Sequence, residues 1–120
     1  MKRVEDTEGA TQRQQDIPQA SADEAKELVE SDDYFVLDVR NPDEHEEKRI
    51  PGTDRLVPVK IIDGMVDKID ADSLLVYCRS GSRSMRACRQ LVDGDFDEVV
   101  NLDGGINGWI DDGFEVERGS

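Results

Sequence analysis

Apolar positions along the chain follow two spacings, one typical of strands and the other of helices. Short apolar runs predict strands at residues 34–39, 56–59, 73–78, 97–102 and 114–116. Apolar residues three or four positions apart, together with capping residues, predict helices at 21–31, 42–48, 82–93 and 104–113. This alternation predicts an α/β fold, with a mainly parallel central sheet of about five short strands and helices on both faces.

The periodic pattern covers residues 17–117, which we expect to form one domain. Residues 1–16 are polar and charged without periodicity, and they predict a disordered tail. That tail has no apolar segment typical of a signal peptide, and no run in the chain approaches the roughly 20 apolar residues of a membrane span. The sequence therefore predicts a cytoplasmic protein.

The chain is strongly acidic, with 29 Asp and Glu residues against 15 Lys and Arg residues and a net charge of −14. Such a charge repels nucleic acids and anionic membranes, so neither is expected as a direct partner. Two explanations stay open. The charge either adapts the surface to high salt, where screening removes self-repulsion, or attracts a basic partner.

The sequence holds two cysteines, Cys78 and Cys88, and a single histidine, His45. This set provides too few ligands for a zinc site, and reduced thiols are the expectation in a cytosol. Cys88 lies on the apolar stripe of the 82–93 helix, where a packing role is favoured over a role as a resolving partner for Cys78.

Cys78 ends the most apolar strand and is followed by hydroxyl groups, a glycine and two arginines, just where a helix begins. Ligands of parallel sheets collect beyond the carboxyl ends of the strands. A tight curl permitted by Gly81 would point backbone amides at one site, and the helix N-terminus would add positive potential. Arg79 and Arg83 would strengthen that potential, and a thiol held there has a lowered pKa. The pattern predicts that Cys78 is a nucleophile.

Three segments resemble, in order, the motifs of single-domain rhodaneses. "VLDVRNPDEHEEKRIPGT" is similar to the family's DVR-x-P-x-E segment that leads to I-P-G-A. "VYCRSGSRS" is similar to its active-site loop, and "NLDGGINGW" to its L-x-G-G-x-x-x-W signature. The resemblance spans roughly residues 17–116.

This resemblance implies a rhodanese-like sulfurtransferase that needs no metal or organic cofactor. A Cys78 persulfide would carry a sulfane sulfur from a small anionic donor, such as thiosulfate, to a thiol, cyanide or a sulfur-carrier protein. The donor would be bound by the loop that follows the cysteine, and two polar residues would support the site. The loop residues are Arg79, Ser80, Gly81, Ser82 and Arg83, and the supporting residues are Asp38 and Arg40.

Two alternatives accompany this interpretation: a non-catalytic docking or regulatory module, and a small-loop relative of the phosphatases. Tyrosine phosphatases place one more residue between cysteine and arginine than separates Cys78 from Arg83, and a shorter cradle suits sulfur better than a phosphoryl group. The chain departs from the family pattern at Lys48 and Arg49, where Gly-His is usual, and at His45, where an aromatic residue is usual. We expect His45 to be a partly exposed helix residue, and the departures leave substrate preference open.

Overall fold

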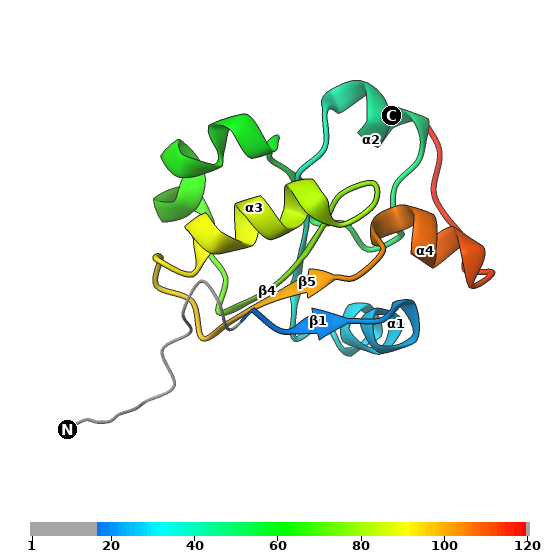
Figure 1. The fold of residues 1–120 in the computed structure, drawn as a ribbon, viewed down its shortest axis with the longest axis horizontal. Coiled ribbons are helices and arrows are strands. Elements are labelled where there is room, and N and C mark those ends of the chain that lie inside the picture. The colour runs from blue at the N-terminus through cyan, green and yellow to red at the C-terminus, as the bar shows by residue number, and fades with distance from the viewer. Residues whose placement is uncertain (1–16, 120) are drawn as a thin grey trace.

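The computed structural model describes residues 17–119 (Figure 1). Its centre is a single sheet of five parallel strands in the order β1-β5-β4-β2-β3. β4 lies at the centre of the sheet, as its apolar sequence predicts, and its last four residues are buried. The α/β class and the parallel sheet are therefore confirmed. The strands are β1 (Gln19–Ala20), β2 (Phe35–Asp38), β3 (Arg55–Leu56), β4 (Ser73–Tyr77) and β5 (Glu98–Leu102).

Within residues 17–119, three α-helices and one long 3₁₀ segment connect these strands, and a fourth α-helix follows the last strand. Ser21 caps α1 as its sequence predicts: its hydroxyl oxygen accepts the Glu24 amide proton at 3.2 Å, and the Glu24 carboxylate accepts the Ser21 amide proton at 2.9 Å. The 3₁₀ segment η2 is not predicted from the sequence. The strand expected at 56–59 overlaps its first residue, Val59. The elements are α1 (Ala22–Ser31), α2 (Pro42–Glu47), η2 (Val59–Lys68), α3 (Ser82–Leu91) and α4 (Gly105–Asp111).

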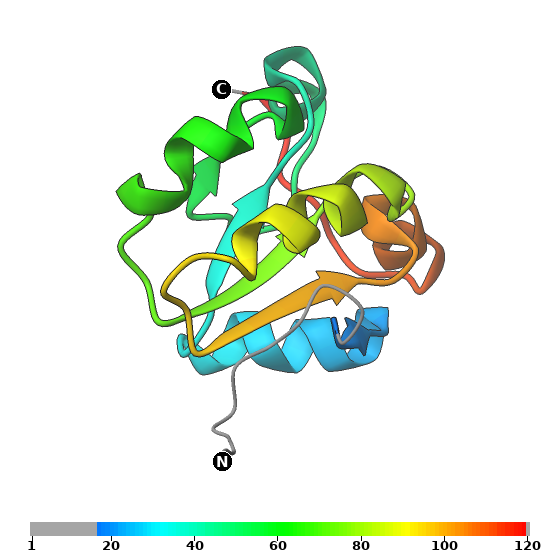
Figure 2. The same cartoon turned by 60° about the vertical axis from the view of Figure 1, so that its left-hand side comes forward.

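Helices cover both faces of the sheet, so the core has two halves. Figure 2 shows α1 (blue) on one side of the sheet, with η2 (green) and α3 (yellow-green) on the other. The α3 side buries Val76, Cys78 and Cys88, while the α1 side buries Leu75, Tyr77 and the α4 residue Trp109. Alternate residues of β4 thus point into opposite halves of the core, and Cys78 belongs to the half beneath α3.

The edges of the sheet differ from the sequence-based prediction. Residues 114–116 do not form a strand; Phe114 packs on Trp109 instead, and the chain then makes an isolated antiparallel bridge between Arg49 and Glu117. The edge next to β5 is taken by β1, too short a strand for periodicity to reveal. The strand expected at 56–59 is also shorter and ends at Leu56, where the chain turns toward η2.

The tail expected at residues 1–16 lies outside the described residues. Across residues 17–119, no helix has the length and apolar character needed to cross a membrane.

Candidate active site

The loop after β4, residues 78–81, curls so that its own backbone faces the sulfur of Cys78. Gly81 adopts φ +113° at the N-cap of α3, in the left-handed region that glycine enters without strain. Its amide donates a hydrogen bond to Cys78 Sγ at 3.0 Å. The curl, the positive φ of Gly81 and the helix that begins at Ser82 are all as the sequence predicts.

The first turn of α4 holds this loop from outside. The amides of Ile106 and Asn107 donate to the carbonyl oxygens of Cys78 and Arg79 at 2.9 and 3.0 Å. Gly105 permits the close approach: a Cβ at that position would lie 2.5 Å from the Arg79 carbonyl oxygen and 2.6 Å from that of Cys78. With the carbonyls turned toward α4, the next amides along the loop are free to face the sulfur.

Burial and hydrogen bonding have opposite effects on the Cys78 thiol. Burial raises its pKa, since the residue is only 1% exposed. The Ser84 hydroxyl and the amides of Ser84, Gly81 and Ser80 favour the ionised sulfur and outweigh burial, so the pKa of Cys78 falls below its ordinary value. The Ser84 hydroxyl also lies 3.1 Å from the Gly81 carbonyl oxygen. It has one proton to give, and an ionised sulfur is the stronger acceptor of the two.

Cys88 presents the opposite case. It is fully buried in the core beneath α3, as its position on the apolar stripe predicts. Burial raises the pKa of its thiol to about 12, and no comparable set of donors offsets the effect. Cys88 is therefore a protonated packing residue near neutral pH, and both cysteines are free thiols.

Asp38 and Arg40 form a buried ion pair at the end of β2. The guanidinium of Arg40 donates to both carboxylate oxygens of Asp38 at 2.9 and 2.8 Å, and the residues are 2% and 0% exposed. His45 joins them, with Nδ1 3.0 Å from Asp38 Oδ2, and its side chain is 23% exposed, as expected. The Arg40 guanidinium also donates to the Lys48 carbonyl at 2.7 Å, so this network ties the C-terminal half of α2 to the sheet.

The guanidinium of Arg83 is paired with a carboxylate. It donates to both oxygens of Glu44 at 2.8 and 2.9 Å, which joins α2 to the first turn of α3. That pair, with a further hydrogen bond from the Asn41 amide, outweighs burial and lowers the pKa of Glu44 to about 2. Much of the positive potential that the sequence assigns to Arg83 is thus balanced by Glu44.

A small cavity of about 130 Å³ opens beside the loop, between α2 and the start of α4. Arg40, Glu44, Glu47, Lys48, Arg79 and Ile106 line it. Arg40 and Glu44 are engaged in the pairs described above, whereas the side chains of Lys48 and Arg79 form no ion pair with any residue of 17–119. The two cations of the cavity that have no ion-pair partner among residues 17–119 thus come from the loop itself and from the C-cap of α2.

The structure brings the predicted residues together, and it adds Ser84, Glu44 and Gly105, to which the sequence alone assigned no role. One signal for Ser84 was present: it lies four residues before Cys88 on the buried stripe of α3, where a hydroxyl needs a partner. The Glu44–Arg83 pair joins residues 39 positions apart, and no local pattern indicates it. Among the described residues, no cluster of His, Cys, Asp and Glu is arranged to hold a metal ion.

These features define an α/β domain with a cysteine of lowered pKa at the carboxyl end of its central strand. The chain belongs to the rhodanese-like domain family, whose family model matches residues 21–112. It is 33% identical over 93 residues to a sulfurtransferase of Allochromatium vinosum, covering 77% of this chain and 86% of that protein. It is 37% identical over 87 residues to the thiosulfate sulfurtransferase GlpE of Coxiella burnetii, covering 72% and 80%.

Solved structures agree with this assignment of the fold. A rhodanese-related protein from Thermoplasma volcanium superposes with a TM-score of 0.73 at 27% identity, over 83% of this chain and 97% of that one. The family-level activity indicated by the curated relatives is sulfur transfer.

Proposed function

We propose that this protein is a sulfurtransferase that carries sulfur as a persulfide on Cys78. The observation that carries the proposal is the loop geometry: Gly81 donates its amide proton to Cys78 Sγ at 3.0 Å, and further donors from Ser80 and Ser84 favour the ionised sulfur. A thiolate held in this way is a nucleophile without the help of a general base.

In the first step the Cys78 thiolate attacks the outer sulfur of a donor such as thiosulfate. A Cys78–sulfur bond forms while the sulfur–sulfur bond of the donor breaks, and sulfite leaves with the electron pair of that bond. The persulfide that remains has its negative charge on the outer sulfur. The loop amides that favour the ionised Cys78 sulfur, together with the N-terminus of α3, would stabilise that charge.

In the second step a nucleophilic acceptor takes the outer sulfur. A thiol, cyanide or the thiolate of a sulfur-carrier protein bonds to it, and the electron pair of the persulfide bond returns to Cys78 as a thiolate. With cyanide the product is thiocyanate. Sulfite departure and thiolate regeneration balance the cycle, so no external oxidant or reductant is consumed.

The charges around the loop support a small anionic donor. Lys48 and Arg79 line the cavity beside the loop and have no ionic partner among residues 17–119. The chain as a whole carries −14, which repels anions at long range. These two cations would offset that repulsion locally, where the donor approaches.

Mass spectrometry of the protein after thiosulfate treatment tests the proposal. We expect an adduct of about 32 Da, one sulfur atom, on the peptide that contains Cys78. Cys78→Ser should abolish both the adduct and thiosulfate:cyanide sulfur transfer, because a serine hydroxyl is not ionised near neutral pH. The matched control is Cys88→Ala, which should keep the adduct and lose about 1–2 kcal/mol of stability through a small cavity.

Turnover by folded Cys78→Ser would contradict the proposed nucleophile. A wild-type protein that is folded but acquires no adduct from thiosulfate or from any other sulfane donor would instead favour the docking module.

A further inference from the structure

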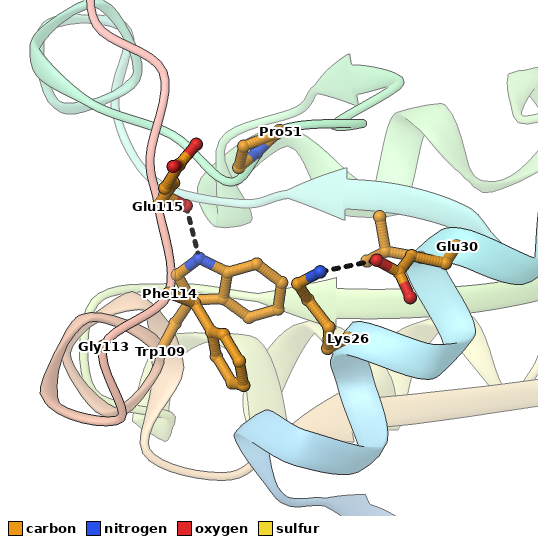
Figure 3. Close-up of a pocket in the computed structure, with 8 residues that line it drawn as sticks. Lys26, Glu30, Pro51, Trp109, Gly113, Phe114 and Glu115 are labelled. Atoms are coloured by element: carbon orange, nitrogen blue, oxygen red, sulfur yellow. Dashed lines mark hydrogen bonds and ion pairs between the residues drawn. The ribbon is translucent and has the colours of Figure 1, made fainter.

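A second and larger cavity, of about 440 Å³, lies between α1 and the segment that follows α4 (Figure 3). Its apolar walls are Val29, Pro51 and the rings of Trp109 and Phe114, whose centroids are 5.1 Å apart at an interplanar angle of 52°. Concave, mainly apolar sites of this volume are typical of small-molecule binding. The cavity shares no lining residue with the one beside the Cys78 loop.

An ammonium group already lies in this cavity. The Lys26 Nζ atom is 5.7 Å from the centroid of the Phe114 ring and 2.5 Å from the carboxylate of Glu30 (Figure 3). An aromatic face together with a carboxylate is the usual environment of a bound organic cation. Because the Lys26 and Glu30 side chains are 38% and 63% exposed, their pair is weak and another cation can exchange with Lys26.

The charges at the rim favour a cation over an anion. Glu30 balances Lys26, while the carboxylate of Glu115 at the opposite rim has no ion-pair partner within residues 17–119. The indole Nε1 of Trp109 donates to the Glu115 backbone carbonyl at 2.7 Å, so Trp109 and residue 115 are held as one wall. The net charge of −14 adds to the repulsion of an anionic ligand.

We infer that this cavity binds a small organic cation, an ammonium group that bears an apolar ring or short chain. The ligand's ammonium replaces that of Lys26 over Phe114 and beside Glu30, and its apolar part lies against Trp109 and Pro51. The inference stands apart from sulfur transfer, since it uses neither Cys78 nor its loop.

Trp109 gives a direct measurement because it is the only tryptophan in the chain. The full-length protein would be titrated with benzyltrimethylammonium while Trp109 fluorescence is recorded, with phenylacetate as the anionic comparison and benzyl alcohol as the neutral one. We expect a saturable change with the cation, at an affinity about five-fold or more above either comparison. A signal that does not saturate, or equal binding of phenylacetate, would overturn the inference.

Two variants make the test sharper. Lys26→Met keeps the apolar stem and removes the internal competitor, so it should tighten benzyltrimethylammonium binding about five-fold. Glu30→Gln should weaken binding by a similar factor, because it removes the carboxylate. An anion site would respond to both changes with the opposite sign, and that result would also overturn the inference.

The matched controls change the same charges outside the cavity. Lys60→Met and Glu27→Gln alter exposed side chains that do not line it, and we expect each to leave the affinity nearly unchanged. Cys78→Ser should bind benzyltrimethylammonium like the wild type, whether or not sulfur transfer is the function. The controls could shift the affinity as much as Lys26→Met and Glu30→Gln do. That result would mean that overall charge causes the effect, and it would contradict the assignment of this cavity.

Discussion

The acidity of Cys78 rests mainly on uncharged donors at short range. The sequence draws attention to Arg79 and Arg83, but one is exposed and the other is paired with Glu44. The groups that lower the pKa of Cys78 against its burial are the Ser84 hydroxyl and three backbone amides. Short hydrogen bonds in a buried site are little screened by salt, whereas a charge at the surface is.

Ser84 offers a test of this interpretation. Replacing Ser84 with alanine removes one hydrogen bond to an ionised sulfur, a loss of roughly 1.5–3 kcal/mol, and should raise the pKa of Cys78 by about one to two units. The pKa would be followed by thiolate absorbance near 240 nm (about where thiolates absorb) and by the pH dependence of alkylation. Ser82→Ala, which removes an exposed hydroxyl from the same turn, is the control and should leave the Cys78 pKa in place. An unchanged pKa in Ser84→Ala would show that the Ser84 hydroxyl does not stabilise the Cys78 thiolate.

Candidate site residues could be predicted where a pattern of neighbouring residues determines their position, and could not where a contact between distant segments does. The place of Cys78 at the strand end and the positive φ of Gly81 were predictable, because strand end, glycine and helix start follow one another within a few residues. Asp38 and Arg40 came from the resemblance to the family, and the structure shows them as a buried ion pair beside the loop. Glu44 could not be predicted as a partner of Arg83, since their contact depends on where α2 lies against α3 in the folded chain.

At the scale of elements, α4 acts as a clamp on the Cys78 loop. The amides of Ile106 and Asn107 donate to the carbonyls of Cys78 and Arg79, and only a glycine at position 105 lets the backbones approach this closely. Gly105→Ala should therefore destabilise the protein by about 1–3 kcal/mol beyond backbone strain and push α4 from the loop. Gly113→Ala separates the two effects, because Gly113 also has a positive φ, +89°, but open space around its Cβ position.

Urea denaturation of both glycine variants would measure the difference in stability. Alkylation of Cys78 in the folded protein would report on the loop, and we expect slower reaction near neutral pH in Gly105→Ala, because misplaced amides raise the pKa of the thiol. Equal stability and equal alkylation rates in the two variants would show that the contact of α4 with the loop is unimportant.

The ion pair between α2 and α3 predicts a particular pH dependence. The pKa of Glu44 is lowered in the folded state to about 2 from 4.5, so the unfolded chain binds more protons between these values. The stability from ionised Glu44 is therefore complete well above pH 4.5, declines as the pH falls below 4.5, and is lost below about 2. Glu44→Gln keeps a capping side chain at the start of α2 but removes the charge.

The melting temperature of the wild type should exceed that of Glu44→Gln at pH 7, and the gap should close as the pH is lowered toward 2. Glu46→Gln, an exposed change on the same helix, controls for net charge. A gap that stays constant over this range would mean that the charge of Glu44 does not stabilise the fold.

Helices and strands were predictable wherever burial of one face makes apolar residues recur at regular spacing in the sequence. The apolar run of β4 and the stripe of α3 identify both elements and their place in the core. Residues 114–116 have the composition of a strand, yet Phe114 packs on Trp109 and the segment joins no edge of the sheet. That edge is filled by β1, whose two residues pair with Asn101 and Leu102 and are too few to show any period.

At the scale of the whole molecule, acidic side chains gather at the amino-terminal ends of the strands, away from the Cys78 loop. Asp67, Asp70, Asp72 and Asp95 line one depression there, next to the start of β4. Like charges held this close destabilise the folded state, and dissolved salt screens them. High-salt adaptation and a basic partner, the two explanations of the −14 charge, make different predictions for the free protein.

If the charge adapts the protein to salt, its melting temperature should rise steadily as KCl increases from dilute to molar concentration. Over that range the screening length falls from about 30 Å at 0.01 M to about 3 Å at 1 M, which removes most repulsion between exposed carboxylates. Because KCl also acts on apolar burial, the triple variant Asp67→Asn, Asp70→Asn and Asp95→Asn is the comparison: it should melt higher than the wild type in dilute buffer and respond less to KCl. Melting curves of both proteins would decide the matter. A wild-type melting temperature that stays flat or falls would reject salt adaptation and leave attraction to a basic partner as the explanation, because a surface built for docking gains its stability from the partner rather than from salt.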